Sequence, residues 1–418
     1  MLVAKTVVIV GALDTKGEEF AFVRELLRNR GLDTLVVDFG VLGDPTFSPD
    51  IGSAQVAAAG GGNLDELRTG GHKDEAMRVM AKGLAVVARR LYDEGRMAGI
   101  LGMGGGGGTS IATTAMRALP VGLPKLMVTT VAGMDASGFI GSKDVTLMPS
   151  VVDVAGFNRI SRRIYTNAAA AIAGMVAVEA IAADEKPVIV ASMFGNTTKA
   201  VDHARELLEA SGYEVLVFHA TGSGGRAMES LIADGSIRAS LDITTTELAD
   251  EVCGGIESAG PERCFAASRA GIPAILVPGC VDMANFGSPP TVPDRYRDRN
   301  LYEWNPNVTI LRTNVEENQR IGEMLAAAAN AAMAPVAFLL PLGGVSMLDS
   351  VGREFWDPQA DRACFEAIKA NLRPGIPVIE LAENINDAAF AEQAVTMLLT
   401  MLANTRAESG DMAASGRR

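Results

Sequence analysis

The sequence predicts an α/β protein with two Rossmann-like lobes, each built on a mostly parallel sheet flanked by helices. Short runs of β-branched residues alternate with longer helical segments along the chain, which is typical of parallel βαβ units. The second half begins again with a pattern similar to that of the first. A charged turn that ends in proline, at residues 184–187, separates the two halves.

The first lobe is predicted to contain four strands with helices between them. Each strand is a short apolar run, and the helices show the longer period expected of one buried face. The strands are expected within 7–10, 33–40, 99–102 and 123–133, and the helices at 18–31, 76–95 and 109–119. A further alanine-rich helix, at 165–183, precedes the boundary between the lobes.

The second lobe opens with a segment that aligns with the start of the chain. Arg24–Leu27 falls on Arg205–Leu208, and Lys16 has a counterpart in Lys199. The similarity is compatible with a duplication and equally with two similar solutions of one packing problem. Five more strand candidates follow, within residues 241–248, 272–279, 307–313, 334–344 and 376–381.

The length of the chain, 418 residues, favours two or three domains. We expect an N-terminal lobe at 1–184 and a C-terminal lobe at 185–403. The last segment, 404–418, is polar and aperiodic, which predicts a disordered tail.

Composition and charge exclude several classes of function. The formal net charge of −13 gives an acidic surface that repels phosphate backbones and anionic lipids, so no nucleic acid or membrane partner is expected. The longest uncharged apolar stretch, 168–178, is far shorter than the roughly 20 residues of a membrane span. Four dispersed cysteines and only three histidines argue for a cytoplasmic protein with free thiols and no protein-built metal site.

Glycine is over-represented, at 45 of 418 residues, and five glycines are consecutive at Gly104–Gly108. They follow an apolar strand and precede Thr109 and Ser110, which are expected to open a helix. Such a loop can bring backbone N–H groups close to a phosphate. It is not a P-loop, because no lysine follows the last glycine. The alternative is a flexible or close-packed turn.

Two other loops are predicted at the same edge of the first sheet. Asp14, Thr15 and Lys16 follow the first strand, where Lys16 could neutralise a phosphate and Asp14 could hold a metal-bound water. The local alternative is a helix cap. Thr129 and Gly133 belong to a loop of small residues after another strand, which leaves room for a ligand or forms an ordinary turn.

The second lobe carries polar residues at several predicted strand ends. His219 leads into a second glycine loop before a helix, which predicts an anion site. We expect catalytic roles for His219, Glu247 and Asp282, and contacts to a small anionic metabolite from Gly222, Gly224, Gly225, Asn285 and Arg312. Taken singly, each has a structural alternative as a cap, a turn or a strand-end residue.

Residues 287–307 form a basic and aromatic stretch in an otherwise acidic chain. Its prolines exclude a helix, and a loop of about 20 residues in a compact domain is usually functional. A lid or a dimer arm whose arginines reach a substrate is one interpretation, and an exposed loop or subunit contact is the other.

Several motifs together resemble the uncharacterised bacterial family related to the plant tobamovirus-resistance protein, over residues 1 to 403. They are GALDTKGEE, GMGGGGGTS, MFGNTT, HATGSGGRAME, TTTELADEV, PGCVDMANFG and PLGGVSMLDS. The resemblance implies an ATP-binding N-terminal lobe and a homodimer. Its motifs place the nucleotide on Asp14, Thr15, Lys16, Gly104, Gly105, Gly107, Gly108, Thr109 and Ser110. Gly106 stands where the family pattern has a serine, which removes one side-chain contact to phosphate.

The resulting hypothesis is a cytoplasmic ATP-binding enzyme that acts on a small anionic metabolite. Mg²⁺ is expected with the triphosphate, because it neutralises charge at such sites. A nucleotide-sensing or interaction module without turnover is one alternative. A metabolite enzyme of the lyase or hydrolase type, with no nucleotide role, is the other.

Overall fold

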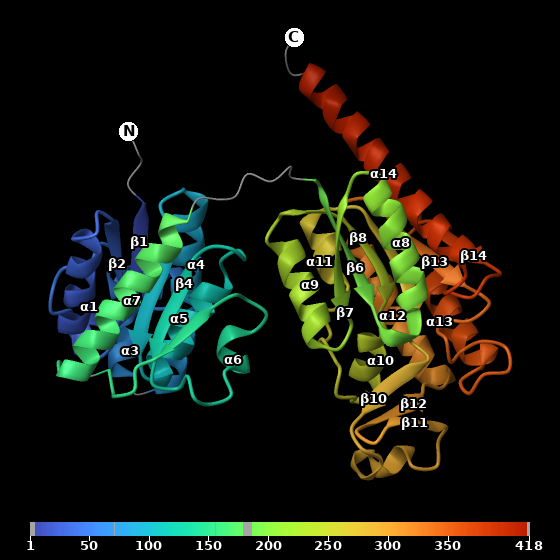
Figure 1. Cartoon of the computed structure of the whole chain (residues 1–418), viewed down its shortest axis with the longest axis horizontal. Helices are drawn as coiled ribbons and strands as arrows, with labels where there is room; N and C mark the ends of the chain where they lie inside the picture. Colours follow the sequence, from blue (N-terminus) through green and yellow to red (C-terminus); the bar gives the residue numbers. More distant parts are fainter. Residues whose placement is uncertain (1–4, 71, 155, 179–185, 416–418) are drawn as a thin grey trace. The chain divides into compact units, whose positions relative to one another are not determined.

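The chain divides into two compact units, Met1–Ala182 and Ala183–Arg418 (Figure 1). The computed structural model describes residues 5–70, 72–154, 156–178 and 186–415. The boundary predicted at residue 184 lies outside the described residues. Each unit has a parallel sheet between layers of helices, which confirms the predicted fold class.

The first unit is built on a five-stranded parallel sheet with the order β2-β1-β3-β4-β5. Its strands are β1 (Thr6–Gly11), β2 (Asp33–Asp38), β3 (Gly99–Gly104), β4 (Lys125–Thr129) and β5 (Thr146–Pro149). The three central strands are buried almost throughout, because helices cover both faces of the sheet.

Helices cover the two faces of this sheet in two separate apolar clusters (Figure 1). Helices α1 (Leu13–Arg28) and α7 (Arg159–Ala177) pack together on one face. Helices α4 (Lys73–Asp93) and α5 (Gly106–Arg117) pack together on the other. The shorter helices are α2 (Ser53–Ala59), α3 (Leu64–Thr69) and α6 (Ser137–Ile140).

The second unit has a six-stranded parallel sheet with the order β14-β13-β9-β8-β6-β7. Its strands are β6 (Val188–Met193), β7 (Glu214–His219), β8 (Ile237–Thr244), β9 (Ala274–Gly279), β13 (Val336–Pro341) and β14 (Val378–Leu381). The order of its first four strands repeats that of the first sheet, in agreement with the internal similarity of the sequence.

Helices α8 (Thr198–Ala210) and α14 (Ala388–Ser415) lie side by side over one face of the second sheet (Figure 1). The opposite face carries α9 (Ser223–Ala233), α10 (Thr246–Cys253), α11 (Phe265–Ala270), α12 (Val315–Asn330) and α13 (Pro358–Asn371). All four cysteines lie in this unit, and each is free and buried.

A small antiparallel sheet, with the order β10-β12-β11, lies at one end of the second unit (Figure 1). Its strands are β10 (Met283–Phe286), β11 (Leu301–Asn305) and β12 (Val308–Arg312). The stretch 287–307, predicted as a single functional loop, instead supplies β11 and two short 3-10 helices. Two of its arginines are used internally, because Arg295 donates to the Cys253 carbonyl (2.9 Å) and Arg299 pairs with Glu317 (2.9 Å).

The C-terminal segment also differs from its prediction. Residues 404–415, expected to be disordered, continue α14 to Ser415. Alanine, glutamate, arginine and methionine in this segment favour a helix once the buried turns around Leu398 and Leu402 have nucleated it. No helix among the described residues is long and apolar enough to cross a membrane.

Candidate functional site

The carboxyl ends of β1, β2 and β3 surround a cavity of 610 Å³, which we call the β1–β3 cavity. In the sheet, β2 lies on one side of β1 and β3 lies on the other. The cavity therefore lies where the strand order reverses. Open α/β sheets bind their ligands at this position. Seven residues predicted from the sequence line it: Asp14, Thr15, Lys16, Gly104, Gly105, Gly107 and Gly108.

The glycine run forms the end of β3 and the first turn of α5. The helix begins at Gly106, three residues earlier than the predicted start, and the Thr109 N–H donates to the Gly105 carbonyl (2.8 Å). The N–H groups of Gly106, Gly107 and Gly108 therefore have no partner inside the helix. They present the positive end of the helix dipole at the cavity wall.

Packing accounts for Gly102 and constrains Gly104, where a methyl group would lie 3.2 Å from the Gly108 Cα, and it leaves Gly105–Gly108 unexplained. A methyl group at Gly102 would lie 2.8 Å from the Met127 sulfur and 3.1 Å from Ala112 Cβ, which is too close. At Gly105–Gly108 the nearest atoms would lie 3.7 to 3.9 Å away, and no φ there falls in the left-handed region. Neither packing nor backbone strain requires glycine at these four positions.

Asp14 holds the loop after β2 against the loop after β1. One of its carboxylate oxygens accepts from the N–H groups of Leu42 (2.7 Å) and Gly43 (3.2 Å). Gly40 has no room for a side chain, because a methyl group there would lie 2.6 Å from this carboxylate. The helix α1 is preceded by Ala12, so Asp14 does not act as its cap. Its other oxygen has no hydrogen-bond partner among the described residues.

Lys16 lies at a break in helix α1. Its φ of −135° and ψ of 23° are non-helical, although its N–H still donates to the Ala12 carbonyl (3.1 Å). Its side chain lines the β1–β3 cavity and pairs with no carboxylate among the described residues. Thr15 is exposed beside it and makes a weak contact with the Ala12 carbonyl (3.5 Å). An unpaired ammonium group at this wall is free to meet an anion.

Sequence reasoning missed the wall that α3 and α4 contribute. It carries three basic or titratable side chains, Arg68, His72 and Lys73. Apolar side chains complete the lining: Phe39, Leu67, Ala76, Met77, Met80, Met103 and Ile111. The predicted helix at 76–95 begins after Arg68, His72 and Lys73, so the sequence did not place them on it. Only the packing of α3 and α4 on the sheet shows which of their side chains face the cavity.

The remaining predicted residues of this unit lie elsewhere. Thr109 is fully buried, and its hydroxyl lies 2.6 Å from that of Thr129, so the pair ties α5 to the end of β4. Ser110 does not line the β1–β3 cavity. Thr129 and Gly133 line a different hollow of 450 Å³ at the carboxyl ends of β4 and β5, which we call the β4–β5 cavity.

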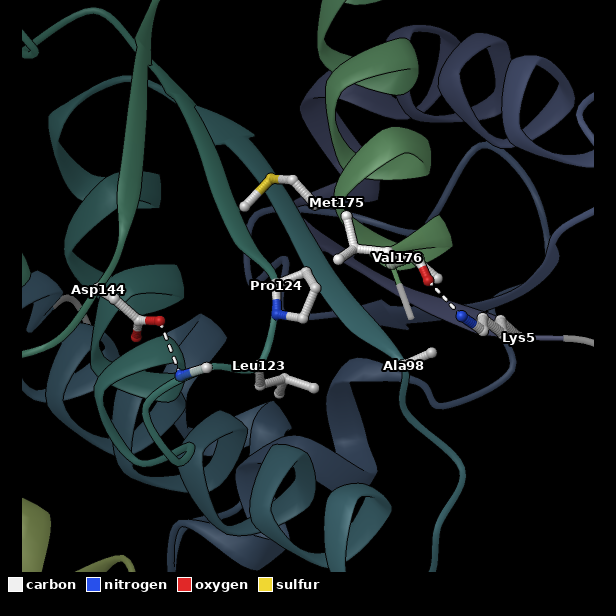
Figure 2. Close-up of a pocket in the computed structure, with 9 residues that line it drawn as sticks. Lys5, Ala98, Leu123, Pro124, Asp144, Met175 and Val176 are labelled. Atoms are coloured by element: carbon white, nitrogen blue, oxygen red, sulfur yellow. Dashed lines mark hydrogen bonds between the residues drawn. The ribbon is translucent and has the colours of Figure 1, made fainter. Parts of the chain in front are cut away.

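A third hollow, of 560 Å³, lies at the opposite edge of the first sheet (Figure 2). Lys5 and Asp144 contribute its charged groups, and both are bonded within the chain. The Lys5 ammonium donates to the Val176 carbonyl (2.6 Å), and Asp144 accepts from the Gly122 N–H (2.9 Å), as Figure 2 shows. This third hollow lies at the amino ends of the strands, away from the edge where ligands of such sheets bind.

The glycine loop of the second unit already holds a carboxylate of the chain. The N–H groups of Gly222 and Gly225 donate to one oxygen of Glu247, at 2.7 and 3.0 Å. The other oxygen of Glu247 accepts from Arg263 (2.6 Å). Gly224 is a packing glycine, since a methyl group there would overlap the His219 carbonyl. The two amides predicted to bind a metabolite are thus occupied by a buried side chain.

Arg263 links Glu247 to a larger buried network. Its guanidinium pairs with both oxygens of Asp242, at 2.5 and 2.7 Å, and with Glu229 at 3.1 Å. Ser192 donates to Asp242 in turn (2.6 Å). A fully buried charge of this kind is stable only when it is paired, so the network fixes β6, β8 and α9 relative to one another.

Asp282 and Arg312 belong to a second buried network. Asp282 accepts from the Ser346 hydroxyl (2.8 Å), and its other oxygen has no partner among the described residues. Arg312 pairs with Asp361 (2.7 Å) and lies 3.6 Å from Asp349. Burial, reinforced by the charge of Asp349, raises the pKa of Asp282 to about 7 and that of Asp361 to about 9.

His219 and Asn285 lie apart from these networks. His219 is exposed at the end of β7 and packs on Phe194, with 5.4 Å between ring centroids. The Asn285 amide donates to Asp250 (2.9 Å), whose pKa is raised to about 7 by burial. The second-unit candidates are therefore divided among separate internal contacts.

No group of three or more histidine, cysteine, aspartate or glutamate side chains among the described residues is arranged to hold a metal ion. A metal at the β1–β3 cavity would therefore need ligands from a bound molecule as well as from Asp14.

Comparison with known proteins gives matches over nearly the whole chain. The model of the uncharacterised protein family (UPF0261) N-terminal domain matches residues 5–180, and that of its C-terminal domain matches residues 186–402. A UPF0261 protein of Clostridium tetani is 47% identical over 400 residues, which cover 95% of this chain and 99% of that protein.

A tomato protein and a solved structure are also similar. The ToMV resistance protein Tm-1(GCR237) of Solanum lycopersicum is 40% identical over 339 residues, which cover 79% of this chain and 45% of the tomato protein. A UDP-N-acetylglucosamine 2-epimerase structure from Rickettsia bellii aligns over 96% of this chain and 97% of its own, with 8% identity and a TM-score of 0.23. A score this low carries no weight on function.

Proposed function

Since the chain belongs to the uncharacterised protein family UPF0261, we propose its function from its own geometry: it is an enzyme that binds ATP in the β1–β3 cavity of its first unit. The cavity lies at the edge and the strand reversal where α/β sheets bind nucleotides. Its 610 Å³ falls within the range of about 300–1,000 Å³ that is usual for small-molecule sites.

The observation that carries this proposal is the room left at Gly105–Gly108. Side chains would fit there in the ligand-free protein, yet all four positions are glycine. A phosphate bound to the N–H groups at the start of α5 would use that room, and a β-carbon at Gly105, Gly107 or Gly108 would obstruct it. Lys16 lies on the same cavity wall with an unpaired charge, which favours a polyanion.

The rest of the lining supports a nucleotide over a bare phosphate. Apolar side chains from α4, among them Met77 and Met80, provide a surface for a planar base. Lys73 adds positive charge to the lining, and Arg68 lies there paired with Asp44 (3.5 Å). The cationic, glycine-rich side of the lining suits the phosphates of a nucleotide, and the apolar side suits its base.

Mg²⁺ fits this arrangement as a companion of the triphosphate. Proteins usually hold it by one or two carboxylates together with substrate phosphates. Asp14 lines the cavity, and one of its oxygens has no partner among the described residues. Asp14 would hold the ion, which when bound would neutralise phosphate charge.

The proposal assigns the chemistry to the first unit. In the second unit, Glu247, Asp282 and Arg312 are bonded to other side chains, and the Gly222–Gly225 amides hold Glu247. These contacts support the fold, and Glu247 occupies the two amides that were predicted to bind the metabolite.

Calorimetric titration with ATP and Mg²⁺ tests the proposal on three proteins. The wild type should bind, and Lys16→Ala should bind at least about tenfold more weakly, because a charge-assisted contact is worth about 1.5–3 kcal/mol. Lys199→Ala is the matched control, because Lys199 is exposed at the corresponding position of the second unit and should change nothing. No binding by the wild type, or equal binding by Lys16→Ala, would overturn the assignment.

A further inference from the structure

We propose that the β4–β5 cavity binds a small, hydroxyl-bearing molecule that receives the terminal phosphate of ATP. This inference rests on the proposed function of the neighbouring cavity. It begins from the observation that Thr129 and Gly133, predicted to contact the nucleotide, line a second hollow of their own. That hollow has 450 Å³ and lies at the carboxyl edge of the same sheet.

The linings of the two cavities are neighbours at Gly105 and Thr130. A methyl group at Gly105 would lie 3.7 Å from the Thr130 hydroxyl, and one at Gly106 would lie 3.9 Å from Val131. The Thr130 N–H donates to the Gly104 carbonyl (3.4 Å). Thr130, which lines the β4–β5 cavity, therefore lies directly beside the start of α5, where the phosphates would bind.

Buried hydroxyl groups hold the start of α5 against the end of β4 and the loop that follows it. The Thr109 and Thr129 hydroxyls are 2.6 Å apart, and the Val131 N–H donates to Thr129 (3.1 Å). Thr109 lies directly after the last glycine and Thr129 at the end of β4. The glycine turn and the loop after β4 are thus fixed to each other, as two substrates that must meet would require.

The lining of the β4–β5 cavity selects the class of molecule. No lysine, arginine or histidine lines it, which disfavours an anion. Thr130 and Asp153 offer a hydroxyl and an exposed carboxylate, and Ala132 and Gly133 leave space. The N–H groups of Ala132 and Gly133 donate to no other described residue. Donors and acceptors without positive charge suit a neutral molecule that carries hydroxyl groups.

The loop after β5 is held in an unusual conformation beside this cavity. Val151 has a φ of 64° and is 78% exposed, although β-branched residues rarely adopt the left-handed region. The Val152 N–H donates back to the Ser150 carbonyl (2.6 Å), so the chain turns sharply at the cavity rim. Such strain is tolerated where a specific loop shape serves a site.

The transfer step balances without a further reactant. The hydroxyl oxygen of the acceptor attacks the terminal phosphorus and forms a new P–O bond. The bond from that phosphorus to the bridging oxygen breaks, and its electron pair leaves with ADP. The hydroxyl proton passes to the Asp153 carboxylate, while Lys16 and the N–H groups at the start of α5 stabilise the charge on the phosphoryl group.

Two glycine variants test whether the β4–β5 cavity itself, and not the region around it, is needed for the transfer. A β-carbon at Gly133 would meet no atom within 4 Å and its φ is ordinary, so Gly133→Leu should fold and fill the cavity. Gly138 has the same freedom in the same region but lies outside the lining, which makes Gly138→Leu the matched control. ATP titrations should give all three proteins affinities within twofold of one another.

The assay incubates each protein with Mg²⁺, ATP labelled in its terminal phosphate, and the small-molecule fraction of a cell extract. Wild type and Gly138→Leu should transfer label to a hydroxyl-bearing compound, and Gly133→Leu should do so more than about tenfold less. Asp153→Asn should lower kcat by about 100-fold with little change in KM, as expected for loss of a general base.

The outcomes distinguish the two proposals. If ATP does not bind, the proposed function fails and this inference fails with it. If ATP binds but no compound is labelled, or Gly133→Leu labels as fast as wild type, only the acceptor site is overturned.

Discussion

At Gly107, an added methyl group would meet only the end of the Met77 side chain, 3.7 Å away, so alanine fits the ligand-free protein. The residue also lies in the first turn of α5, where alanine favours the helix over glycine by up to about 1 kcal/mol. We expect Gly107→Ala to keep or raise the Tm and to weaken ATP binding about tenfold, because the methyl group occupies the space of a phosphate.

Gly102→Ala gives the opposite pattern and serves as the comparison. Its methyl group would crowd Ala112 and Met127, so we expect a loss of about 1–3 kcal/mol in the free energy of unfolding. Thermal melts and ATP titrations of both variants check the pair. A Gly107→Ala protein that is destabilised, or that binds ATP like wild type, would contradict the interpretation of the glycine run.

For single residues, the sequence predicted which polar residues and glycines lie at the ends of strands. It did not predict which groups they hydrogen-bond to. It predicted Lys16 and the glycine run at one edge, and both line one cavity. It also predicted an open anion site at Gly222 and Gly225, where Glu247 from the start of α10 supplies the anion. Which side chain reaches a given amide depends on how α10 packs, and that information is not local.

Among the elements of the second unit, three buried carboxylates share one arginine. Asp282 follows β9, Asp349 follows β13, and Asp361 lies on α13, all near Arg312. Burial and mutual repulsion raise the pKa of Asp282 to about 7 and of Asp361 to about 9. A carboxyl group whose pKa is raised on folding stabilises the protein fully only below its unfolded pKa, and this contribution is lost as the pH rises through the folded pKa.

We therefore expect the free energy of unfolding to fall as the pH rises from 6 to 8. A single group with a folded pKa of about 7, such as Asp282, contributes about 1.4 kcal/mol of this loss. Asp282→Asn keeps an oxygen that can accept from Ser346 and cannot ionise, so its denaturant midpoint should vary less over this range. A pH dependence in the variant equal to that of the wild type would show that Asp282 does not carry a raised pKa in the folded protein.

The elements that differed from prediction share one cause. Helix α5 begins at Gly106 and not at Thr109, and α14 continues to Ser415. In both cases the sequence alone predicts a loop, because glycine, and in the C-terminal segment also asparagine, threonine, serine and aspartate, disfavour helix when taken singly. A neighbouring turn that is already packed lowers the cost of extending the helix, which composition does not reveal.

On the scale of the whole molecule, alternation of apolar runs and helical segments was enough to predict two parallel sheets. It was not enough to predict the small antiparallel sheet of β10, β11 and β12, because the prolines and arginines of residues 287–307 mask β11. The strand reversal beside β1, which positions the β1–β3 cavity, also required the structure.

The four cysteines can report, through the reactivity of their thiols, when the core of the second unit becomes exposed. The first unit has none, and burial raises the pKa of all four thiols, so they should not react with iodoacetamide while the protein is folded. Cys253, Cys264 and Cys364 lie in one apolar core, which must open as a whole to expose any of them.

Mass spectrometry of protein incubated with iodoacetamide at pH 8 should therefore show unmodified and multiply modified chains, with few that carry a single addition. Accumulation of singly modified chains would show that one thiol is exposed by a local motion. The rate at which the modified population grows measures how often the core of the second unit opens, without a signal from the first. Buried thiols that take no part in the proposed chemistry thus make the stability of one unit measurable inside the intact two-unit chain.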